Sequence, residues 1–367
     1  MKNFLAAGAA LAFSVCAFAQ TGTSPANSSQ AGTQSSVPQP AKPAPPPQTP
    51  SVGARIVTNV VLVPVTVKNG RGDLVPNLEK SDFRVFQDGK EQTIRNFWDE
   101  AFPVSAVVLL DDDLPTEESQ KVLQSLDSIA AGFSAQDEVA LVRFDEYPKT
   151  VLDFTANNDA LFAKLKEIRT NPKDALDSRV PGTPSSTMML PPMTNGHTEG
   201  GAADIPILGT STNGVTKHVD DAVHYAAEML RNRGRDRRKI IFIVSDGTND
   251  RHNQWSFNNT LQLLFSSNIS VYAISVTSPA DILTFRGRGR LSQYAVPTGG
   301  DVFPASSPKE MEPLYSKLTE EARNQYTLGF QPSRTIGRGN CHTLEVRVER
   351  PGLFVTARNA YCAPFPR

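Results

Sequence analysis

Three cysteines, an even balance of charge and short apolar runs exclude several classes of protein. The 367 residues include 37 basic and 38 acidic side chains, so the formal net charge is 37 − 38 = −1. This balance argues against a nucleic-acid binder that works through bulk positive charge, and it points to no particular class of partner. Three cysteines are too few for a small disulfide-built scaffold or a cysteine-rich metal module. The length fits one large or two ordinary soluble domains.

The first segment has the pattern of an export signal. Lys2 supplies a positive start, residues 4–18 form an apolar run, and Ala17-Phe18-Ala19 gives the small-x-small sequence that precedes cleavage. We therefore expect residues 1–19 to be a signal peptide that is cut before Gln20. The run is shorter than the roughly 20 apolar residues that cross a membrane, and no other segment is longer, so we expect no transmembrane anchor. The mature protein is then extracytoplasmic, either periplasmic or secreted.

Two further stretches lack the pattern of packed structure. Residues 20–52 are rich in Pro, Ser and Gln and contain few large apolar side chains. Such a stretch cannot bury enough apolar surface to offset its ordering entropy, so we predict a disordered tether. Residues 170–213 hold several prolines and glycines and three of the six methionines. We predict an irregular insertion loop there, which is either a contact surface or plain disorder.

Between residues 101 and 324, apolar runs typical of buried strands alternate with amphipathic stretches. Strands are expected at 104–110, 139–144, 239–244 and 270–276, and helices at 117–133, 159–168, 219–231, 261–267 and 310–323. This alternation predicts a doubly wound, mostly parallel α/β sheet with its ligand site at the carboxyl ends of the strands. Residues 53–100 and 325–367 are β-rich. We expect them to combine into one small antiparallel sheet or sandwich, because neither has enough strands to be stable alone.

Two cysteines remain after signal cleavage, and both fall in the C-terminal β segment. They flank two strand-like runs that are joined at Arg350-Pro-Gly-Leu353. If Arg350 and Leu353 pair across the turn, opposite residues sum to 703, and 341 + 362 = 703. Cys341 and Cys362 would then face each other within reach of a disulfide. Two free or mispaired thiols are the alternative, because Pro-Gly favours a type II turn over the primed turns of tight hairpins.

Acidic residues follow two of the most apolar predicted strands. Asp111-Asp112-Asp113 comes after residues 107–110, and Ser245-Asp246-Gly247 comes after residues 240–244. Both turns should lie at one edge of the sheet, where several carboxylates together are electrostatically costly unless a cation or donors neutralise them. Clustered hard oxygen ligands suit Mg²⁺ or Ca²⁺.

With these two acidic turns and the helices between them, the chain resembles a von Willebrand factor type A (VWFA) domain. Its flanks are similar to the VWFA-related proteins abundant in acidobacteria, and the matching runs are residues 60–67, 82–89, 326–330 and 344–358. The resemblance covers about residues 57–361. It implies a Rossmann-like domain that binds protein ligands, often through a metal-ion-dependent adhesion site, and that has no enzymatic activity.

The same resemblance implies a set of metal ligands. In the family the site is built from Asp-x-Ser-x-Ser after the first strand, a Thr from a middle loop and an Asp after the fourth strand. Asp111 and Asp246 match, and Asp113 stands in place of the first serine. The threonine is Thr216, although counting back from Asp221-Ala222 puts Lys217 at that position, where an ammonium would repel a cation.

The second serine position is occupied by Pro115, which offers no side-chain ligand unless Thr116 or water replaces it. Two outcomes therefore stay open: a bound Mg²⁺ or Ca²⁺ ion, or a degenerate site held by hydrogen bonds and water. Around it, the ligand-binding rim is expected to consist of Asp112, Thr116, Thr248 and Asn249.

These features lead us to expect an exported, non-enzymatic module that binds a protein ligand through a degenerate adhesion site. One alternative is a structural envelope component in which the site is vestigial. Another is a metal-dependent hydrolase that uses Asp111, Asp113 and Asp246, for which the sequence shows no general base. Neither a Gly-x-Ser-x-Gly motif nor a Walker-type phosphate loop is present.

Overall fold

A computed structural model describes residues 60–171, 217–234, 236–276, 289–332 and 340–363. All of them belong to one compact unit, Ile56–Arg367. The predicted signal peptide, the predicted tether and all but the first two residues of the predicted 170–213 insertion lie outside the described residues.

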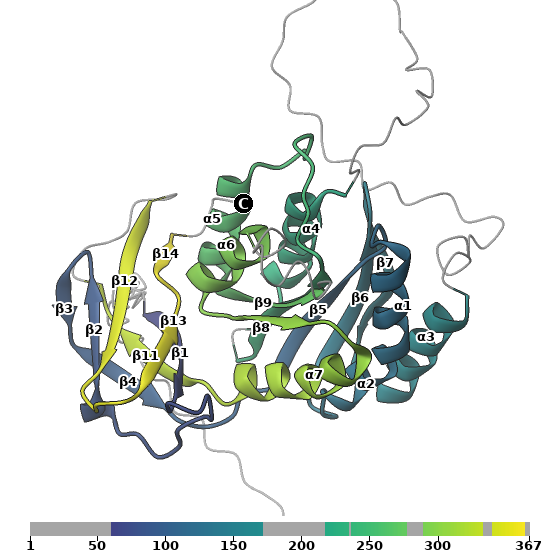
Figure 1. The fold of residues 1–367 in the computed structure, drawn as a ribbon. Helices are drawn as coiled ribbons and strands as arrows, with labels where there is room; N and C mark the ends of the chain where they lie inside the picture. The colour runs from purple at the N-terminus through teal and green to yellow at the C-terminus, as the bar shows by residue number, and fades with distance from the viewer. Residues whose placement is uncertain (1–59, 172–216, 235, 277–288, 333–339, 364–367) are drawn as a thin grey trace, which may run out of the picture. The chain divides into compact units, whose positions relative to one another are not determined.

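A six-stranded sheet forms the centre of the α/β part (Figure 1). The strand order is β10-β9-β8-β5-β6-β7, and every neighbouring pair is parallel except β6 and β7. This is the doubly wound, mostly parallel sheet that the sequence predicts. Its strands are β5 (Val104–Asp111), β6 (Glu138–Phe144), β7 (Pro148–Thr155), β8 (Arg238–Ser245), β9 (Ile269–Val276) and β10 (Val302–Ala305).

Helices cover both faces of this sheet because successive side chains of a strand point to opposite faces. In β5, Ala106 and Val108 belong to one hydrophobic cluster, while Val107 and Leu109 belong to the other. The first cluster is completed by α1 (Thr116–Ser125), α2 (Asp127–Ala131), α3 (Asn158–Thr170) and α7 (Pro308–Arg323). The second is completed by α4 (Val219–Arg231), α5 (Phe257–Ser267) and α6 (Gly289–Thr298).

The predicted elements are present with shifted ends. The expected helix 117–133 is divided into α1 and α2, whereas α4 has the expected bounds 219–231. Three elements of this part were not predicted: β7, α6 and β10. Strand β7 has a mixed burial pattern and two register shifts against β6, so it lacks the clean alternation by which strands are recognised.

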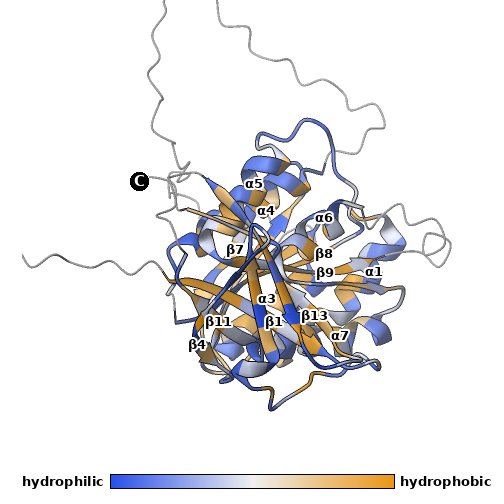
Figure 2. Cartoon of the chain, turned by 90° about the vertical axis from the view of Figure 1, so that its left-hand side faces the viewer, coloured by the Kyte–Doolittle hydropathy of each residue, from blue (hydrophilic) through white to orange (hydrophobic). Residues whose placement is uncertain are grey.

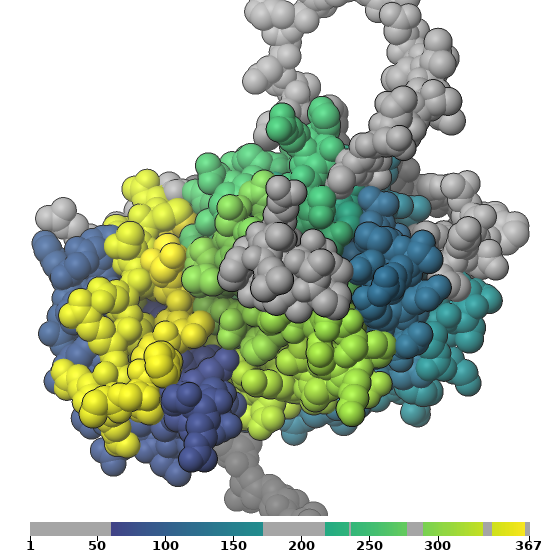
Figure 3. Space-filling view, viewed as in Figure 1, coloured from purple at the N-terminus to yellow at the C-terminus, as the bar shows by residue number. Residues whose placement is uncertain are grey.

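The two β-rich flanks combine into two four-stranded sheets, ordered β13-β1-β11-β4 and β14-β12-β2-β3. The apolar residues of both sheets share a third hydrophobic cluster, so of the two predicted arrangements, one sheet or a sandwich, the sandwich is present. In Figure 3 the N-terminal purple and blue atoms lie beside the yellow C-terminal ones, and Figure 2 shows hydrophobic stretches along the strands of both parts. The N-terminal strands are β1 (Val61–Lys68), β2 (Phe83–Gln87), β3 (Lys90–Gln92) and β4 (Ile94–Trp98). The C-terminal strands are β11 (Tyr326–Phe330), β12 (Cys341–Val348), β13 (Phe354–Ala357) and β14 (Ala360–Cys362).

The predicted disulfide and its register are confirmed, but the tight hairpin is wrong. Cys341 is bonded to Cys362 and lies opposite it in the β12–β14 pair, and the next two pairs also sum to 703. Beyond them the strands separate: the rest of β12 pairs with β2, and β13 pairs with β1. Separation places Leu344 and Ala357 in different sheets that face one apolar core, which a flat two-stranded hairpin could not cover.

Removing this disulfide is expected to lower the free energy of unfolding. A cross-link between residues 21 apart in sequence restricts the unfolded chain, and loops of this length contribute about 3 kcal/mol. The double variant Cys341→Ser/Cys362→Ser should therefore unfold at a lower denaturant concentration than the wild type. Denaturation of the wild type with and without reductant gives the matching comparison, and equal midpoints would contradict the expectation.

Buried cations join the β sandwich to the α/β part. The Arg238 guanidinium donates hydrogen bonds to the Gln325 carbonyl and to Thr327 Oγ1, each at 2.7 Å. Arg358 donates to the carbonyl groups of Phe265 and Leu62. Burial lowers the pKa of each arginine to about 10. The acceptors of these hydrogen bonds are uncharged oxygens, so the contacts hold the two parts together through hydrogen bonding more than through ion pairing.

Candidate functional site

The carboxyl edge of the six-stranded sheet brings together the two acidic turns. Strands β5 and β8 are parallel neighbours, with Leu110 opposite Val244, so Asp111 and Ser245 end the two strands side by side. Ser245 Oγ donates a hydrogen bond of 2.6 Å to Asp111 Oδ2. Asp246 follows directly. The predicted proximity of the two turns is therefore present, and it arises because parallel strands end at the same edge.

A lysine lies between the two predicted metal-binding carboxylates. Lys217 Nζ is 3.2 Å from Asp111 Oδ2 and 3.0 Å from Asp246 Oδ2, and the residue is only 2% exposed. Backbone hydrogen bonds fix its position, because the Lys217 carbonyl accepts from Asp250 N at 2.9 Å. His218 N donates to the Asp145 carbonyl, also at 2.9 Å. Of the two residues that the sequence offered for this position, the lysine contacts both carboxylates, while Thr216 lies outside the described residues.

Burial and neighbouring charges act in opposite directions on the pKa values of Asp111 and Lys217. Burial raises the pKa of Asp111 to about 6, although Lys217 and Ser245 favour its ionised form. Burial alone would lower the pKa of Lys217, but the charges of Asp111 and Asp246 outweigh it, so that pKa is raised. Lys217 Nζ and the two carboxylates thus form one largely buried ion-pair network.

The next residue, Asp112, is neutralised by a second internal cation. Arg143 Nε donates to Asp112 Oδ1 at 2.7 Å, and the Asp112 backbone N–H bonds to the Phe144 carbonyl. Burial raises the pKa of Asp112 to about 6. Asp113 differs, because its side chain is exposed and only its backbone N–H bonds to Asp111, at 3.0 Å. Among the described residues of the acidic run, Asp113 therefore presents the most accessible carboxylate.

The other predicted rim residues have varied roles. Asn249 Oδ1 accepts hydrogen bonds from Val219 N at 2.8 Å and Asp220 N at 3.3 Å, so this side chain satisfies the first N–H groups of α4. Thr248 N donates to Asp246 Oδ1 at 2.8 Å. Thr116 is exposed at the start of α1. The sequence placed all three residues at this edge. It did not indicate that the Asn249 side chain would accept hydrogen bonds from the first N–H groups of α4.

The residues present do not fit a divalent ion. The described part of the chain contains no group of three or more His, Cys, Asp or Glu side chains placed to hold a metal. Asp111, Ser245 and Asp246 already share hydrogen bonds with one another or with Lys217. A metal at those oxygens would occupy the space that the lysine ammonium fills.

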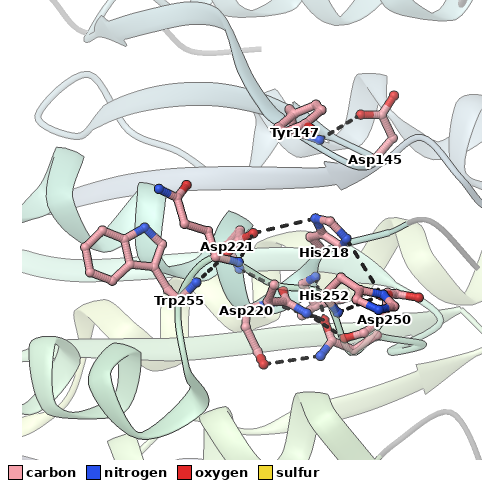
Figure 4. A network of polar contacts seen from close by, with 12 residues as sticks. Asp145, Tyr147, His218, Asp220, Asp221, Asp250, His252 and Trp255 are labelled. Carbon is pink, nitrogen blue, oxygen red and sulfur yellow. Dashed lines mark hydrogen bonds and ion pairs between the residues drawn. The ribbon is translucent and has the colours of Figure 1, made fainter. Parts of the chain in front are cut away.

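A second polar network, whose residues were not among the predicted site residues, lies beside the first (Figure 4). The His218 ring lies between Asp221, 3.6 Å from Nδ1, and Asp250, 3.9 Å from Nε2. His252 Nδ1 lies 2.6 Å from Asp250 Oδ1. These residues are close only because the start of α4 packs against the turn after β8. Their sequence spacing follows no ligand motif that could have revealed them.

Two aromatic side chains also lie in this network. The Tyr147 residue is 63% exposed, and its N–H bonds to Asp145 Oδ1 at 3.1 Å. Trp255 is half-buried and stacks on His224, with ring centroids 3.9 Å apart and an interplanar angle of 9°.

Acidification is expected to destabilise the protein through His224. Burial lowers the pKa of this ring, so the folded state binds its proton less readily than the unfolded state does. The neutral ring of His224 therefore contributes to the free energy of unfolding above the ordinary histidine pKa of about 6.5. This contribution is lost as the pH falls below that value. Denaturant unfolding at about pH 7.5 and about pH 5, followed by tryptophan fluorescence and circular dichroism, should show a smaller pH dependence in His224→Gln. An unchanged pH dependence in that variant would contradict the assignment.

No protein-family model matches the sequence, and no curated protein matches it. Solved structures give distant likenesses. Proximal thread matrix protein 1 from the mussel byssus aligns at 15% identity and a TM-score of 0.38, over 61% of this chain and 48% of its own, which is about half its length. Another structure of the mussel protein is described as having a zinc-occupied MIDAS motif. An aerotolerance-related membrane protein from Bacteroides fragilis aligns at 12% identity and a TM-score of 0.38, over 59% of this chain and 99% of its own.

At this level of similarity, the fold assignment rests on the chain's own strand order and helix placement. The Rossmann-like α/β sheet and the antiparallel sandwich are read directly from those features.

Proposed function

We propose that this chain is an exported, non-enzymatic protein-binding module of the VWFA type, similar to the VWFA-related proteins of acidobacteria. Its binding surface is the carboxyl edge of the six-stranded sheet. One observation carries the proposal: the turns after β5, β6 and β8 and the start of α4 are bonded into one continuous polar edge. Asp113 and Tyr147 are exposed on that edge and are available to a partner.

The state of the acidic groups supports binding over catalysis. A metal-dependent hydrolase needs an ion and a free general base close to a substrate position. Asp111 and Asp246 are bonded to Lys217, and Asp112 is bonded to Arg143. Two of the three carboxylates that the hydrolase alternative would use, Asp111 and Asp246, are therefore engaged by an internal cation, whereas Asp113 is exposed.

Export is proposed from the predicted signal peptide together with the disulfide, since disulfides persist mainly in oxidising compartments. None of the helices that the structure describes is long and apolar enough to cross a membrane.

Co-purification from the native envelope fraction tests this function. Asp113→Lys and Tyr147→Glu change the proposed surface, whereas Glu100→Lys reverses an exposed acid that precedes β5, at the opposite end of the strands. A partner retained by the wild type and by Glu100→Lys, and lost with both edge variants, is the expected result. Equal retention by all four proteins would contradict the proposed surface.

One further variant in the co-purification and one turnover assay separate the two alternative functions. A structural envelope component that assembles through the β sandwich should lose its partner with Phe354→Glu, because Phe354 is 64% exposed on β13. A hydrolase should act on a panel of esters and phosphoesters, and that turnover should disappear in Asp246→Ala. Either outcome would replace the proposed function.

A further inference from the structure

We propose that Lys217 is the resident cation of the carboxyl edge, so that an internal ammonium replaces a divalent ion and the site works without metal. The cation role stands on the geometry of the site alone. Metal-independent binding of a partner rests in addition on the proposed function.

The first observation is the set of contacts that the ammonium makes. Lys217 Nζ bonds to one carboxylate from the turn after β5 and to one from the turn after β8. Ser245 Oγ bonds to the same Asp111 oxygen as the lysine, at 2.6 Å. The Asp111 side chain is fully buried and that of Lys217 is 3% exposed. Two acids that would otherwise repel each other inside the protein are thus joined by one cation of the chain.

Space and charge both oppose a metal ion at this position. Mg²⁺ and Ca²⁺ lie roughly 2.0–2.6 Å from their oxygen ligands. An ion between Asp111 Oδ2 and Asp246 Oδ2 would therefore collide with an ammonium that lies 3.0–3.2 Å from the same atoms. It would also add two positive charges next to the lysine, and such repulsion is strong in a buried site.

Backbone hydrogen bonds, as well as the two carboxylates, fix the position of Lys217. The Lys217 carbonyl accepts a hydrogen bond from Asp250 N, and the next residue, His218, donates its N–H to Asp145. These two bonds connect the lysine to the turns after β8 and β6 and fix the start of its side chain. A metal could enter only if this segment left the edge.

The burial of Lys217 also affects how a partner is held. In a metal site with an open position, a carboxylate from the partner can bind the ion. Here the cation is 2% exposed, so a carboxylate from a partner has almost no access to it. Partner recognition then depends on the exposed groups of the edge, such as Asp113 and Tyr147, and it should persist in the presence of a chelator.

Binding of Mn²⁺ alone tests the cation role. Mn²⁺ up to about 1 mM, a range that includes weak extracellular cation sites, is titrated into the full chain and followed by electron paramagnetic resonance. We expect no stoichiometric binding to the wild type. We expect one equivalent to bind to Lys217→Ser with a dissociation constant on the order of 10⁻⁴–10⁻³ M, and this binding should be lost in Lys217→Ser/Asp246→Asn.

Lys68 provides a matched control, because its ammonium also contacts two acids, Asp301 at 3.2 Å and Glu321 at 2.8 Å. Lys68→Ser should gain no Mn²⁺ site, since those acids are not arranged at the carboxyl edge with a serine hydroxyl. Equal gains in both variants would overturn the assignment, because any freed pair of acids would then suffice. So would failure of a folded Lys217→Ser to bind Mn²⁺.

Mn²⁺ titration of the wild type tests the cation role of Lys217 even if Lys217→Ser does not fold. One equivalent of Mn²⁺ bound to the wild type and lost in Asp246→Asn would overturn the proposal. Partner capture with and without a chelator then tests metal-independent binding separately. Capture that needs the Asp113 edge and also needs Mg²⁺ would overturn metal independence while leaving the proposed function in place. Absence of any edge-dependent capture would contradict the proposed function and leave the Mn²⁺ result unaffected.

Discussion

Lys217→Met is expected to lower the free energy of unfolding by about 3–5 kcal/mol, because breaking a buried ion pair leaves an uncompensated charge. Two carboxylates, Asp111 and Asp246, would remain near each other without the cation that now bonds to both. Methionine has a similar length and keeps most of the packing, so the loss reports charge more than volume. Denaturant unfolding at neutral pH, followed by circular dichroism, measures it.

Two comparisons separate this effect from general damage. Lys217→Met/Asp246→Asn should be less destabilised than the single variant, because one of the two unpaired charges is gone. Lys164→Met removes a lysine that pairs with Glu167 on the exposed side of α3, and it should change stability by less than about 1 kcal/mol.

The cost of Lys217→Met should also depend on pH. The pKa of Asp111 is raised to about 6 by burial, and losing the lysine removes a group that opposes this rise. In the variant the pKa of Asp111 should therefore lie above about 6. Protonation of Asp111 as the pH falls toward that value removes one of the unpaired charges, so the difference from the wild type should shrink between neutral pH and about pH 6. A difference that is small at neutral pH, or constant down to about pH 4.5, would show that the ammonium does not stabilise these carboxylates.

Arg238→Ala is expected to destabilise the protein by about 3–5 kcal/mol, through a cavity and through buried acceptors that lose their donor. The Gln325 carbonyl and Thr327 Oγ1 both accept hydrogen bonds from this guanidinium, which also lies over the Phe102 ring at 4.6 Å. Since these contacts join β8 to the sandwich strand β11 and the residue before it, cleavage by a protease under native conditions should become faster within residues 60–98 and 326–363.

Arg231→Ala is the matched control for this variant. Arg231 and Arg238 both belong to the arginine-rich stretch 231–239. The Arg231 guanidinium, however, pairs with Glu228 on the surface of α4. Its loss should change stability by less than about 1 kcal/mol. If the two variants have equal stability and equal cleavage rates, the buried guanidinium does not hold the sandwich to the α/β part.

Sequence patterns alone were sufficient for the four central strands of the α/β sheet, β9, β8, β5 and β6, and for the edge where the site lies. Residues 106–110 and 240–244 are continuous apolar stretches, and this is the pattern of parallel strands buried on both faces. Because parallel strands share an edge at their carboxyl ends, the meeting of Asp111 with Asp246 followed from topology. Counting across residues 350–353 also predicted the register of Cys341 with Cys362, although the chain between these cysteines separates into two sheets. Each of these inferences needs only local periodicity and the geometry of a sheet.

The tertiary structure decided which groups neutralise the acids and how the strands of the sandwich are shared. Lys217 lies 106 residues from Asp111 along the chain, and no periodicity relates side chains at that separation. Counting had left both Thr216 and Lys217 as candidates, and only the packing of the segment before α4 against the turns after β6 and β8 placed the ammonium between the carboxylates. Likewise, β12 and β13 separate into two sheets because the apolar core of the sandwich has to be covered from both sides. Local sequence thus determined the elements and their common edge, whereas long-range packing of charged and apolar side chains determined the chemistry at that edge.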